Sequence, residues 1–342
     1  METSHKSKSI TPFVLFFFLL LSSVLLYLFG ETWLRKTLLY LSTATWARNL
    51  VSSLPIAQPV ARRFVAGESR AESLAAAREL NARGMLVTMD YLGESVTSTD
   101  EAIDARDEIL HLLDAIYAED LNANVSVKLS QLGLKLDENL AFDNVYLLLE
   151  RAQQYNNKIR IDMEESSVVD VTLEIYRTLR DRYGMKNVGV VLQAYLYRTE
   201  ADVNQLIDEG AWIRLCKGAY MEPPEVAFAQ KEQTDENYVK LMRMLLSEKA
   251  RDKHVYVGIA THDEAMIAAT KDYVNTNSVP LDAFEFQMLY GVRREIQETL
   301  VAEGYRVRIY TPYGQAWYPY FVRRLAERPA NLWFFISNFF KK

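Results

Sequence analysis

The stretch at residues 212–224, WIRLCKGAYMEPP, combines residue types that could bind an anion. Apolar residues alternate in its first half, and Arg214 and Lys217 then follow in quick succession. Gly218 and two prolines end the run before a helical pattern begins. A guanidinium and an ammonium group at the carboxyl end of a buried strand suit a phosphate, a carboxylate or a reduced cofactor ring. The plainer alternative is a surface strand with two solvated cations.

Eight apolar or β-branched runs predict the strands that would position these groups, and helical patterns lie between them. The predicted strands are 85–90, 124–130, 158–164, 188–195, 212–218, 255–261, 283–289 and 306–313. The predicted helices are 101–118, 140–155, 168–183, 200–208, 225–250, 263–273, 292–303 and 316–327. Strands that alternate with helices of about 10–20 residues imply parallel pairing through crossovers.

Eight such units over about 245 residues match the size of a TIM-type (β/α)8 barrel. A doubly wound open sheet is the alternative, but no predicted strand is followed by G-x-G-x-x-G, so a Rossmann dinucleotide site finds no support. In a barrel the active site lies at the carboxyl ends of the strands. All eight predicted ends carry a hydrogen-bonding or ionisable group: Asp90, Lys128, Asp162, Gln193, Arg214 with Lys217, Thr261 with His262, Gln287 and Tyr310. The pattern therefore predicts an active site at that mouth.

The composition excludes several kinds of site. With 342 residues, 49% apolar and 25% charged, the chain can bury the core of one large domain or two small ones. Its net charge is −6 and its basic residues are scattered, which argues against nucleic acid as the partner. The single Cys216 excludes an intramolecular disulfide, and the four widely spaced histidines form no zinc pattern. A buried inert thiol is the more typical role for Cys216.

The last predicted helix carries a second candidate for anion binding. Tyr320, Arg323, Arg324 and Glu327 fall on one continuous helical face. Two adjacent arginines can straddle a carboxylate in a forked geometry, and a preceding aromatic ring can line a small apolar ring. Because this helix follows the eighth strand directly, we expect it to fold back over the mouth. The plainer alternative is an amphipathic helix with solvated cations.

The amino-terminal segment is apolar. Residues 9–30 carry no charge, and a bilayer needs about 20 residues to be crossed. A cleaved signal peptide is the alternative, but the A-x-A pattern is missing after Leu28 and the apolar run is long. We expect an uncleaved anchor at 1–30, a helical arm and linker at 31–70 and the barrel at 71–342. Basic residues flank the segment on both sides, so its orientation is not indicated.

Short motifs run in order from about residue 64 to residue 331: FVAGES, MDYLGES, VSVKLSQLGL, IDMEES, VLQAYLYR, RLCKGAYMEPPEVAF, ATHD, FEFQMLYG, RVRIYTPYG and YFVRRLAERPAN. With these motifs the chain resembles the proline dehydrogenase family in its short, single-function bacterial form. The resemblance implies a distorted (β/α)8 barrel whose last helix lies over the mouth. It also implies FAD-dependent oxidation of L-proline to Δ1-pyrroline-5-carboxylate, the first step of proline catabolism, with hydride passing from C5 to flavin N5.

The resemblance assigns roles on the substrate side. Lys128 and Asp162 look like the ion pair beside the substrate, and Arg323 and Arg324 look like the clamp on its carboxylate. The two side chains that would shape the pocket around the ring are Tyr310 and Tyr320. Glu94 in YLGES resembles the acidic partner that closes an ion-pair gate with Arg323. Asp162 is also expected to act in catalysis, by balancing the field of the neighbouring cations.

On the cofactor side, Arg214 resembles the catalytic residue near the reactive edge of the flavin. Seven further positions resemble FAD contacts: Met163, Gln193, Lys217, Gly218, Ala219, Thr261 and His262. The departure from the family pattern is mild, since Cys216 stands where an aliphatic residue is common.

The resemblance implies membrane quinone as the electron acceptor, and residues 9–30 fit that partner by tethering the barrel to a membrane. The first expectation is a bacterial inner membrane with the barrel on its cytoplasmic face; a mitochondrial inner membrane is the alternative, although an Arg-rich presequence is missing. Three other functions stay open: the same chemistry on hydroxyproline, a class I aldolase with Lys128 or Lys217 as Schiff-base lysine, and an inactive membrane-anchored binding protein that retains the fold.

Overall fold

The computed structural model describes Thr37, Tyr40, Leu41, Ala44, Trp46 and residues 62–93 and 96–327. The chain divides into two compact units, one of which comprises residues 61–317. Helix α13 (Trp317–Glu327) begins at the last residue of this unit and continues into the other unit. The predicted domain boundaries at residues 30 and 70 remain predictions.

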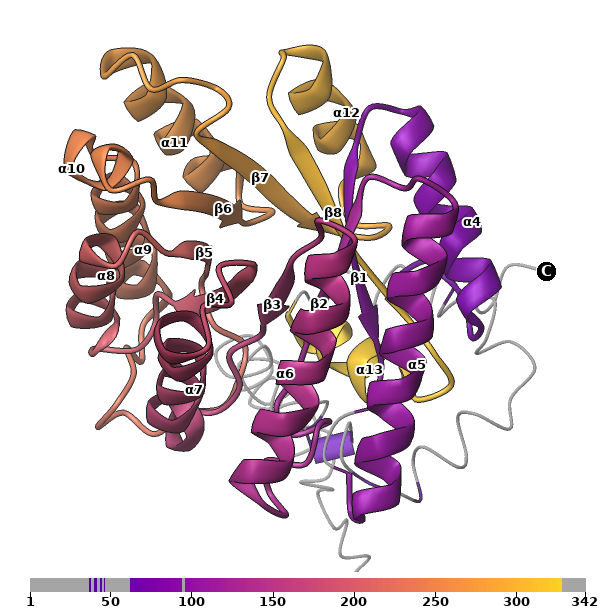
Figure 1. Ribbon diagram of the computed structural model, residues 1–342. Coiled ribbons are helices and arrows are strands. Elements are labelled where there is room, and N and C mark those ends of the chain that lie inside the picture. Colours follow the sequence, from indigo (N-terminus) through magenta and orange to yellow (C-terminus); the bar gives the residue numbers. More distant parts are fainter. Residues whose placement is uncertain are drawn as a thin grey trace, which may run out of the picture. The chain divides into compact units, whose positions relative to one another are not determined.

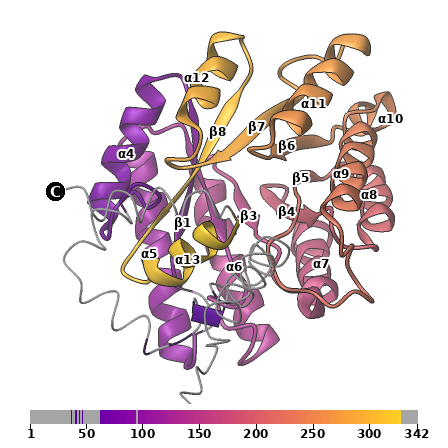
Figure 2. The same cartoon turned by 180° about the vertical axis from the view of Figure 1, so that it is seen from behind.

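Eight parallel strands close a barrel in sequence order, and the last strand pairs with the first. The strands are β1 (Leu86–Tyr91), β2 (Ala123–Val127), β3 (Ile159–Ile161), β4 (Val188–Gln193), β5 (Trp212–Cys216), β6 (Tyr256–Ala260), β7 (Phe284–Leu289) and β8 (Val307–Tyr313). Figure 1 and Figure 2 show the strands from two sides, with helices on the outside. The TIM-type (β/α)8 fold is confirmed, and the open-sheet alternative is wrong.

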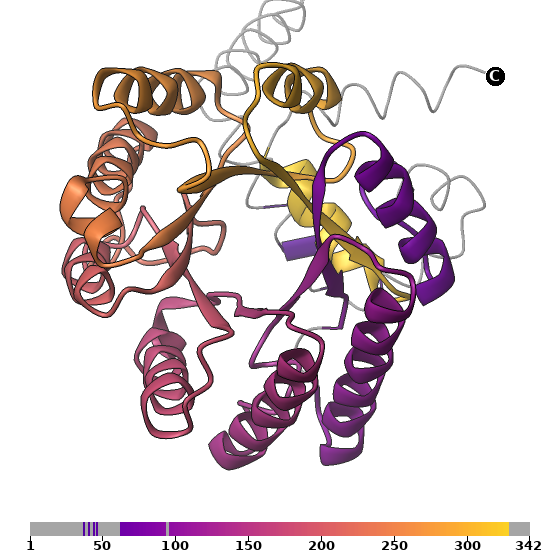
Figure 3. The ribbon, with the colours of Figure 1, turned by 45° about the horizontal axis from the view of Figure 1, so that its top comes forward.

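The helices between the strands form the outer layer, which Figure 3 shows around the ring of strands. They are α5 (Thr99–Ala118), α6 (Glu138–Gln154), α7 (Val169–Arg177), α8 (Thr199–Asp208), α9 (Lys231–Leu245), α10 (Glu248–Asp252), α11 (Glu264–Thr276) and α12 (Arg294–Ala302). Several begin at a side chain that accepts a backbone N–H, as Ser98 does for α5 and Asp137 for α6. Such caps satisfy donors that the first helical turn leaves unpaired.

Two predicted helices differ from the observed ones. The predicted helix at 225–250 begins only at Lys231 and is two helices, because Ser247 starts α10 by accepting from the Ala250 N–H. The predicted helix at 168–183 starts with the 3₁₀ turn η1 (Ser166–Val168) before α7 and ends in a π-helical turn, η2 (Thr178–Arg182). Hydrophobic periodicity does not register such local changes of hydrogen-bonding pattern.

Helix α4 (Arg70–Ala82) was not predicted. It precedes β1 and packs against β1 and β8. Ser69 accepts from the Glu72 N–H, and the Glu72 carboxylate accepts from the Ser69 N–H, which is a capping box. The S-x-x-E pattern at 69–72 is therefore a sequence signal that marks the start of this helix.

The two faces of the strands differ in character. Outward-facing Val87, Val125 and Ile213 are completely buried between the barrel and its helices. Many inward-facing side chains are polar; for example, Arg160 is completely buried on β3. Its guanidinium carbon lies 3.7 Å from the centroid of the Trp212 ring, and its nitrogens have no hydrogen-bond partner among the described residues. The interior therefore holds charged groups as well as packed apolar ones.

The terminal predictions fall largely outside the described residues. The predicted anchor at residues 9–30 lies outside them, and within the described ranges no helix is long and apolar enough to cross a membrane. Helix α13 forms where a last helix is predicted, and the Tyr318 hydroxyl donates to the Leu41 carbonyl at 3.1 Å. The position of this helix over the mouth stays a prediction.

Candidate active site at the barrel mouth

Asp162, directly after β3, is the centre of a buried cluster at the carboxyl ends of the strands. Its Oδ1 accepts from Arg214 Nη1 of β5 at 2.6 Å. Its Oδ2 accepts from the Tyr310 hydroxyl of β8 at 2.7 Å, and Lys128 Nζ, after β2, lies 3.5 Å from the same oxygen. Four groups that are far apart in sequence thus meet because their strands end on the same side of one barrel. The structure therefore brings together the predicted Lys128–Asp162 ion pair, Arg214 and Tyr310.

The surroundings of Asp162 keep its carboxylate ionised. Burial by itself would raise its pKa, but Arg214 and Lys128 outweigh burial, and the pKa of Asp162 lies below its usual value. Burial and the nearby carboxylates raise the pKa of Tyr310. The Tyr310 hydroxyl therefore keeps its proton and remains the donor to Asp162.

Asp90, at the end of β1, is a member of this cluster that the predicted site did not include. Lys128 Nζ donates to both of its oxygens at 3.2 Å. Asp90 is fully buried, and burial raises its pKa to about 6, although Lys128 acts in the opposite direction. The available signal was positional: Asp90 is the polar group that ends the first predicted strand.

Arg214 is held on two further sides. Its Nε donates to Gln287 Oε1 of β7 at 2.5 Å, and its Nη2 donates to Ser126 Oγ of β2 at 3.2 Å. With Asp162 on Nη1, side chains from β2, from β7 and from the residue after β3 fix the guanidinium plane. The sequence marks Gln287 as a polar strand end without indicating a role for it, and it carries no comparable signal for Ser126.

The predicted FAD contact Gln193, at the end of β4, carries an unsatisfied buried acceptor. Its Nε2 donates to the Glu164 carbonyl at 3.2 Å, with the Met163 carbonyl at 3.5 Å, whereas its Oε1 has no partner within the described part of the chain. Leaving a buried carbonyl unpaired is costly, so the amide oxygen fits an N–H donor of a bound ring system. The residues present therefore fit a flavin.

Other predicted FAD contacts lie around the ends of β5 and β6. Lys217 Nζ contacts Asp235 and lies 2.8 Å from Asp263 Oδ2. Burial would raise the pKa of Asp263, but Lys217 and other donors lower it to about 2. Thr261 Oγ1 accepts from the Asp263 N–H at 3.0 Å, and His262 Nε2 accepts from a backbone N–H at 2.8 Å, which places its ring proton on Nδ1.

The loop after β5 depends on a glycine. Gly218 has φ +110°, and a Cβ at this position would lie 2.2 Å from the Tyr195 ring. Both the backbone conformation and the close approach therefore require glycine. Ala219 follows it in the same loop, directly beside the predicted cofactor contacts.

Four predicted site residues are not brought into this cluster by the described structure. Glu94 lies outside the described residues. Arg323 and Arg324 are in α13, but their side chains lie outside the described part. Tyr320 is buried, but it does not belong to the compact unit of residues 61–317 that holds the cluster. Their roles in the gate, the clamp and the pocket stay predictions.

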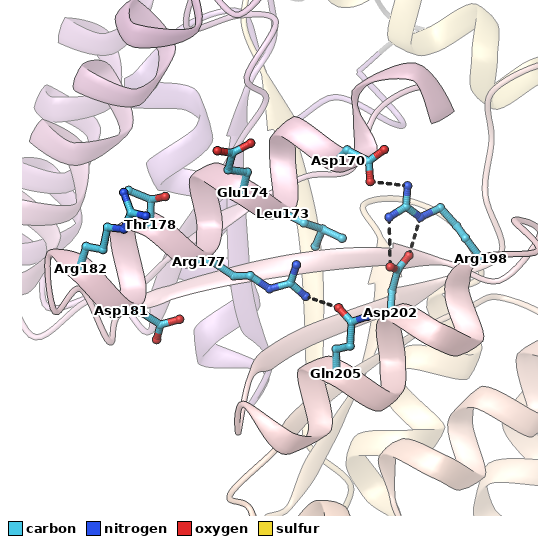
Figure 4. A pocket seen from close by; sticks show the side chains of 10 residues that line it. All are labelled: Asp170, Leu173, Glu174, Arg177, Thr178, Asp181, Arg182, Arg198, Asp202 and Gln205. Atoms are coloured by element: carbon cyan, nitrogen blue, oxygen red, sulfur yellow. Dashed lines mark hydrogen bonds and ion pairs between the residues drawn. The ribbon is translucent and has the colours of Figure 1, made fainter.

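A cleft of about 510 Å³ between α7 and α8 lies away from this cluster. Figure 4 shows Arg198 paired with Asp170 and Asp202, and Arg177 donating to the amide oxygen of Gln205. None of the mouth residues lines it. The cleft belongs to the outer helical layer, and the mouth cluster is the candidate active site.

Comparison with known proteins agrees with this geometry. The family model described as Proline dehydrogenase matches residues 73–336. Proline dehydrogenase 2 of Bacillus subtilis strain 168 is 42% identical over 282 residues, which are 82% of this chain and 91% of that protein. Proline dehydrogenase of Deinococcus radiodurans is 43% identical over 285 residues, covering 82% of this chain and 90% of that protein.

A solved structure, proline utilization A of Bdellovibrio bacteriovorus inactivated by N-propargylglycine, matches with a TM-score of 0.73 and 28% sequence identity. The match covers 79% of this chain and 32% of that chain, so this chain spans about a third of that larger protein.

Proposed function

This chain belongs to the proline dehydrogenase family, and from that membership we propose how it oxidises L-proline to Δ1-pyrroline-5-carboxylate, the first step of proline catabolism. The observation that carries the proposal is the buried cluster of Asp162, Lys128, Arg214 and Tyr310 at the barrel mouth. The unpaired Gln193 oxygen supports FAD as the cofactor. When bound, the flavin supplies the chemistry by accepting a hydride from the substrate C5 at N5.

The chain's own residues prepare the substrate. The substrate nitrogen must lose a proton, because hydride transfer from C5 needs the amine lone pair. Lys128 and Arg214 together disfavour an ammonium group at the mouth, and ionised Asp162 balances their charge. Arg214, fixed by Asp162 and Gln287, presents a permanent positive charge that stabilises negative charge developing on an electron-accepting ring.

The substrate carboxylate is proposed to bind Arg323 and Arg324 of α13, with Tyr320 against the ring and Glu94 as the gate partner of Arg323. The support is the spacing of these residues in the YFVRRLAERP motif and the forked geometry that two guanidinium groups offer. A carboxylate held this way fixes the ring, so that one C–H bond keeps a constant direction.

We also propose that the enzyme passes its electrons to quinone and is tethered to a bacterial inner membrane by residues 9–30, with the barrel on the cytoplasmic face. The support is the uncharged length of that segment, since a lipid-soluble acceptor is reached most directly from the bilayer surface.

The test is a visible absorption spectrum of the purified protein before and after anaerobic addition of L-proline. We expect flavin bands that bleach, with D-proline as the matched control that leaves them unchanged. Bleaching by hydroxyproline but not by proline would reassign the substrate. A protein that stays colourless after incubation with FAD would contradict the proposal and favour the Schiff-base aldolase.

A further inference from the structure

The amide of Gln287 lies inside the barrel between a cation and an anion. Arg214 Nε donates to Gln287 Oε1 at 2.5 Å, and Gln287 Nε2 donates to Glu285 Oε1 at 2.5 Å. A guanidinium has only donors and a carboxylate only acceptors, so the orientation of the amide between them is determined by chemistry. Gln287 is therefore a fixed link from Arg214 to Glu285.

Glu285 is itself firmly held. Arg308 Nε donates to its Oε1 at 2.6 Å, and the Tyr256 hydroxyl donates to its Oε2 at 3.1 Å. Glu285 is completely buried, and although burial would raise its pKa, Arg308 lowers it below the usual value. The carboxylate therefore stays ionised and anchors the link on β6, β7 and β8.

Gly258 of β6 gives independent evidence for this link, because the barrel leaves space at this position for the Gln287 side chain. It pairs with Arg214 on one side and with Glu285 on the other. A Cβ at this position would lie 2.2 Å from Gln287 Nε2. Its φ is not positive, so the backbone does not require glycine there. The missing side chain at residue 258 provides the space for the Gln287 amide.

We propose that Gln287, Glu285 and Gly258 are the positioning residues of Arg214. They fix its guanidinium through Nε, while Asp162 and Ser126 hold the two terminal nitrogens. The inference rests on the proposed function, in which Arg214 lies beside the flavin and stabilises its reduced form. Without the Gln287 acceptor the guanidinium plane of Arg214 can rotate, and its N–H donors no longer keep one fixed orientation.

The first test is Gln287→Met, which keeps the length of the side chain but cannot accept from Arg214 or donate to Glu285. We expect kcat to fall by up to about 100-fold with little change in KM, as misplacement of a catalytic group does. We also expect the reduction potential of the bound flavin to become more negative. Asn187→Leu is the matched control, since this side-chain amide donates to the Leu149 carbonyl at 3.0 Å and the Asn157 carbonyl at 3.2 Å just before β4, at the end of the barrel opposite the mouth.

The second test is Gly258→Ala, which leaves all the hydrogen-bonding groups in place and displaces the Gln287 amide sterically. The clash is with the far end of a flexible side chain, so the variant is expected to fold. It should lower kcat and the flavin potential in the same direction as Gln287→Met. In a Gln287→Ala background, Gly258→Ala should have no further effect, because the space is then open.

A third measurement does not depend on the flavin. In the flavin-free protein, the losses in unfolding midpoint caused by Gln287→Met and Arg214→Met should be non-additive, because the two residues contact each other. Additive losses, or wild-type kcat and potential in Gln287→Met, would overturn the inference. If the flavin of the wild-type protein does not bleach with proline, the proposed function fails. The comparison of unfolding midpoints then still decides whether Gln287 and Arg214 stabilise each other in the folded protein.

Discussion

Asp90 and Asp162 are two buried carboxylates that share Lys128 but differ in their electrostatic surroundings. Asp162 has two cations and a hydroxyl donor around it, whereas Asp90 has Lys128 as its cationic neighbour among the described residues. The pKa of Asp162 is therefore lowered and that of Asp90 raised. Different pKa values for neighbouring acids are typical of sites that transfer protons.

The raised pKa of Asp90 predicts a specific pH dependence of stability. The folded protein keeps the Asp90 proton up to about pH 6, whereas the unfolded chain loses it near pH 4, so this residue makes the free energy of unfolding fall as pH rises between those values. Asp90→Asn should remove that contribution, which is at most about 1.4 kcal/mol per pH unit. Urea unfolding of the wild-type protein and of Asp90→Asn from pH 4 to 7 measures this contribution. If the free energies of unfolding of the two proteins depend on pH in the same way, Asp90 does not have the raised pKa.

Arg323→Met tests the proposed carboxylate clamp. We expect KM for proline to rise far more than kcat falls, because the interaction holds the substrate in the ground state and in the transition state alike. Steady-state kinetics with an artificial electron acceptor measures both constants. Arg306→Met, at the opposite end of β8, is the matched control and should leave KM unchanged. A fall in kcat alone would exclude the clamp.

At the scale of elements, strand prediction was accurate because each strand is a short apolar run between polar loops. All eight predicted strands occur within a few residues of their predicted positions, but β3 is only Ile159–Ile161, shorter than its pattern, because the chain leaves the ladder at Asp162. The break at Ser247 and the π turn after α7 depend on local hydrogen bonds, which hydrophobic patterns do not encode. Asp90 and Gln287 were visible as polar strand ends, but their partners are set by side-chain packing across the barrel.

The capping box of α4 predicts a measurable contribution to stability. Ser69→Ala removes the acceptor of the Glu72 N–H and should lower the free energy of unfolding by about 1 kcal/mol. Ser167→Ala changes the same residue type at an exposed position and serves as the control. Denaturant unfolding of the two variants and of the wild-type protein provides the comparison. If Ser69→Ala is as stable as Ser167→Ala, the cap contributes nothing to the free energy of unfolding.

At the scale of the whole molecule, the proposed anchor predicts where the protein fractionates. Leu20→Lys with Leu25→Lys places two charges inside the apolar segment, each costing about 3 kcal/mol near a bilayer centre. The variant should move to the soluble fraction on cell lysis and keep its activity with a water-soluble acceptor. Thr32→Lys, just outside the segment, should stay with the membranes. If wild-type protein is already soluble, the anchor proposal is wrong.

The charged interior of the barrel has a consequence for the order in which the chain can fold. Asp162 finds its Tyr310 donor 148 residues later in the chain, and Arg214 finds Gln287 73 residues later. In a nascent chain that has emerged only as far as β5, the charged side chains of Asp162 and Arg214 still lack the partners from β7 and β8. Burying these charges without those partners would be costly. We expect the first strands to keep a hydrated inner face during synthesis, so that expulsion of water and closure of the ring coincide with the arrival of β7 and β8.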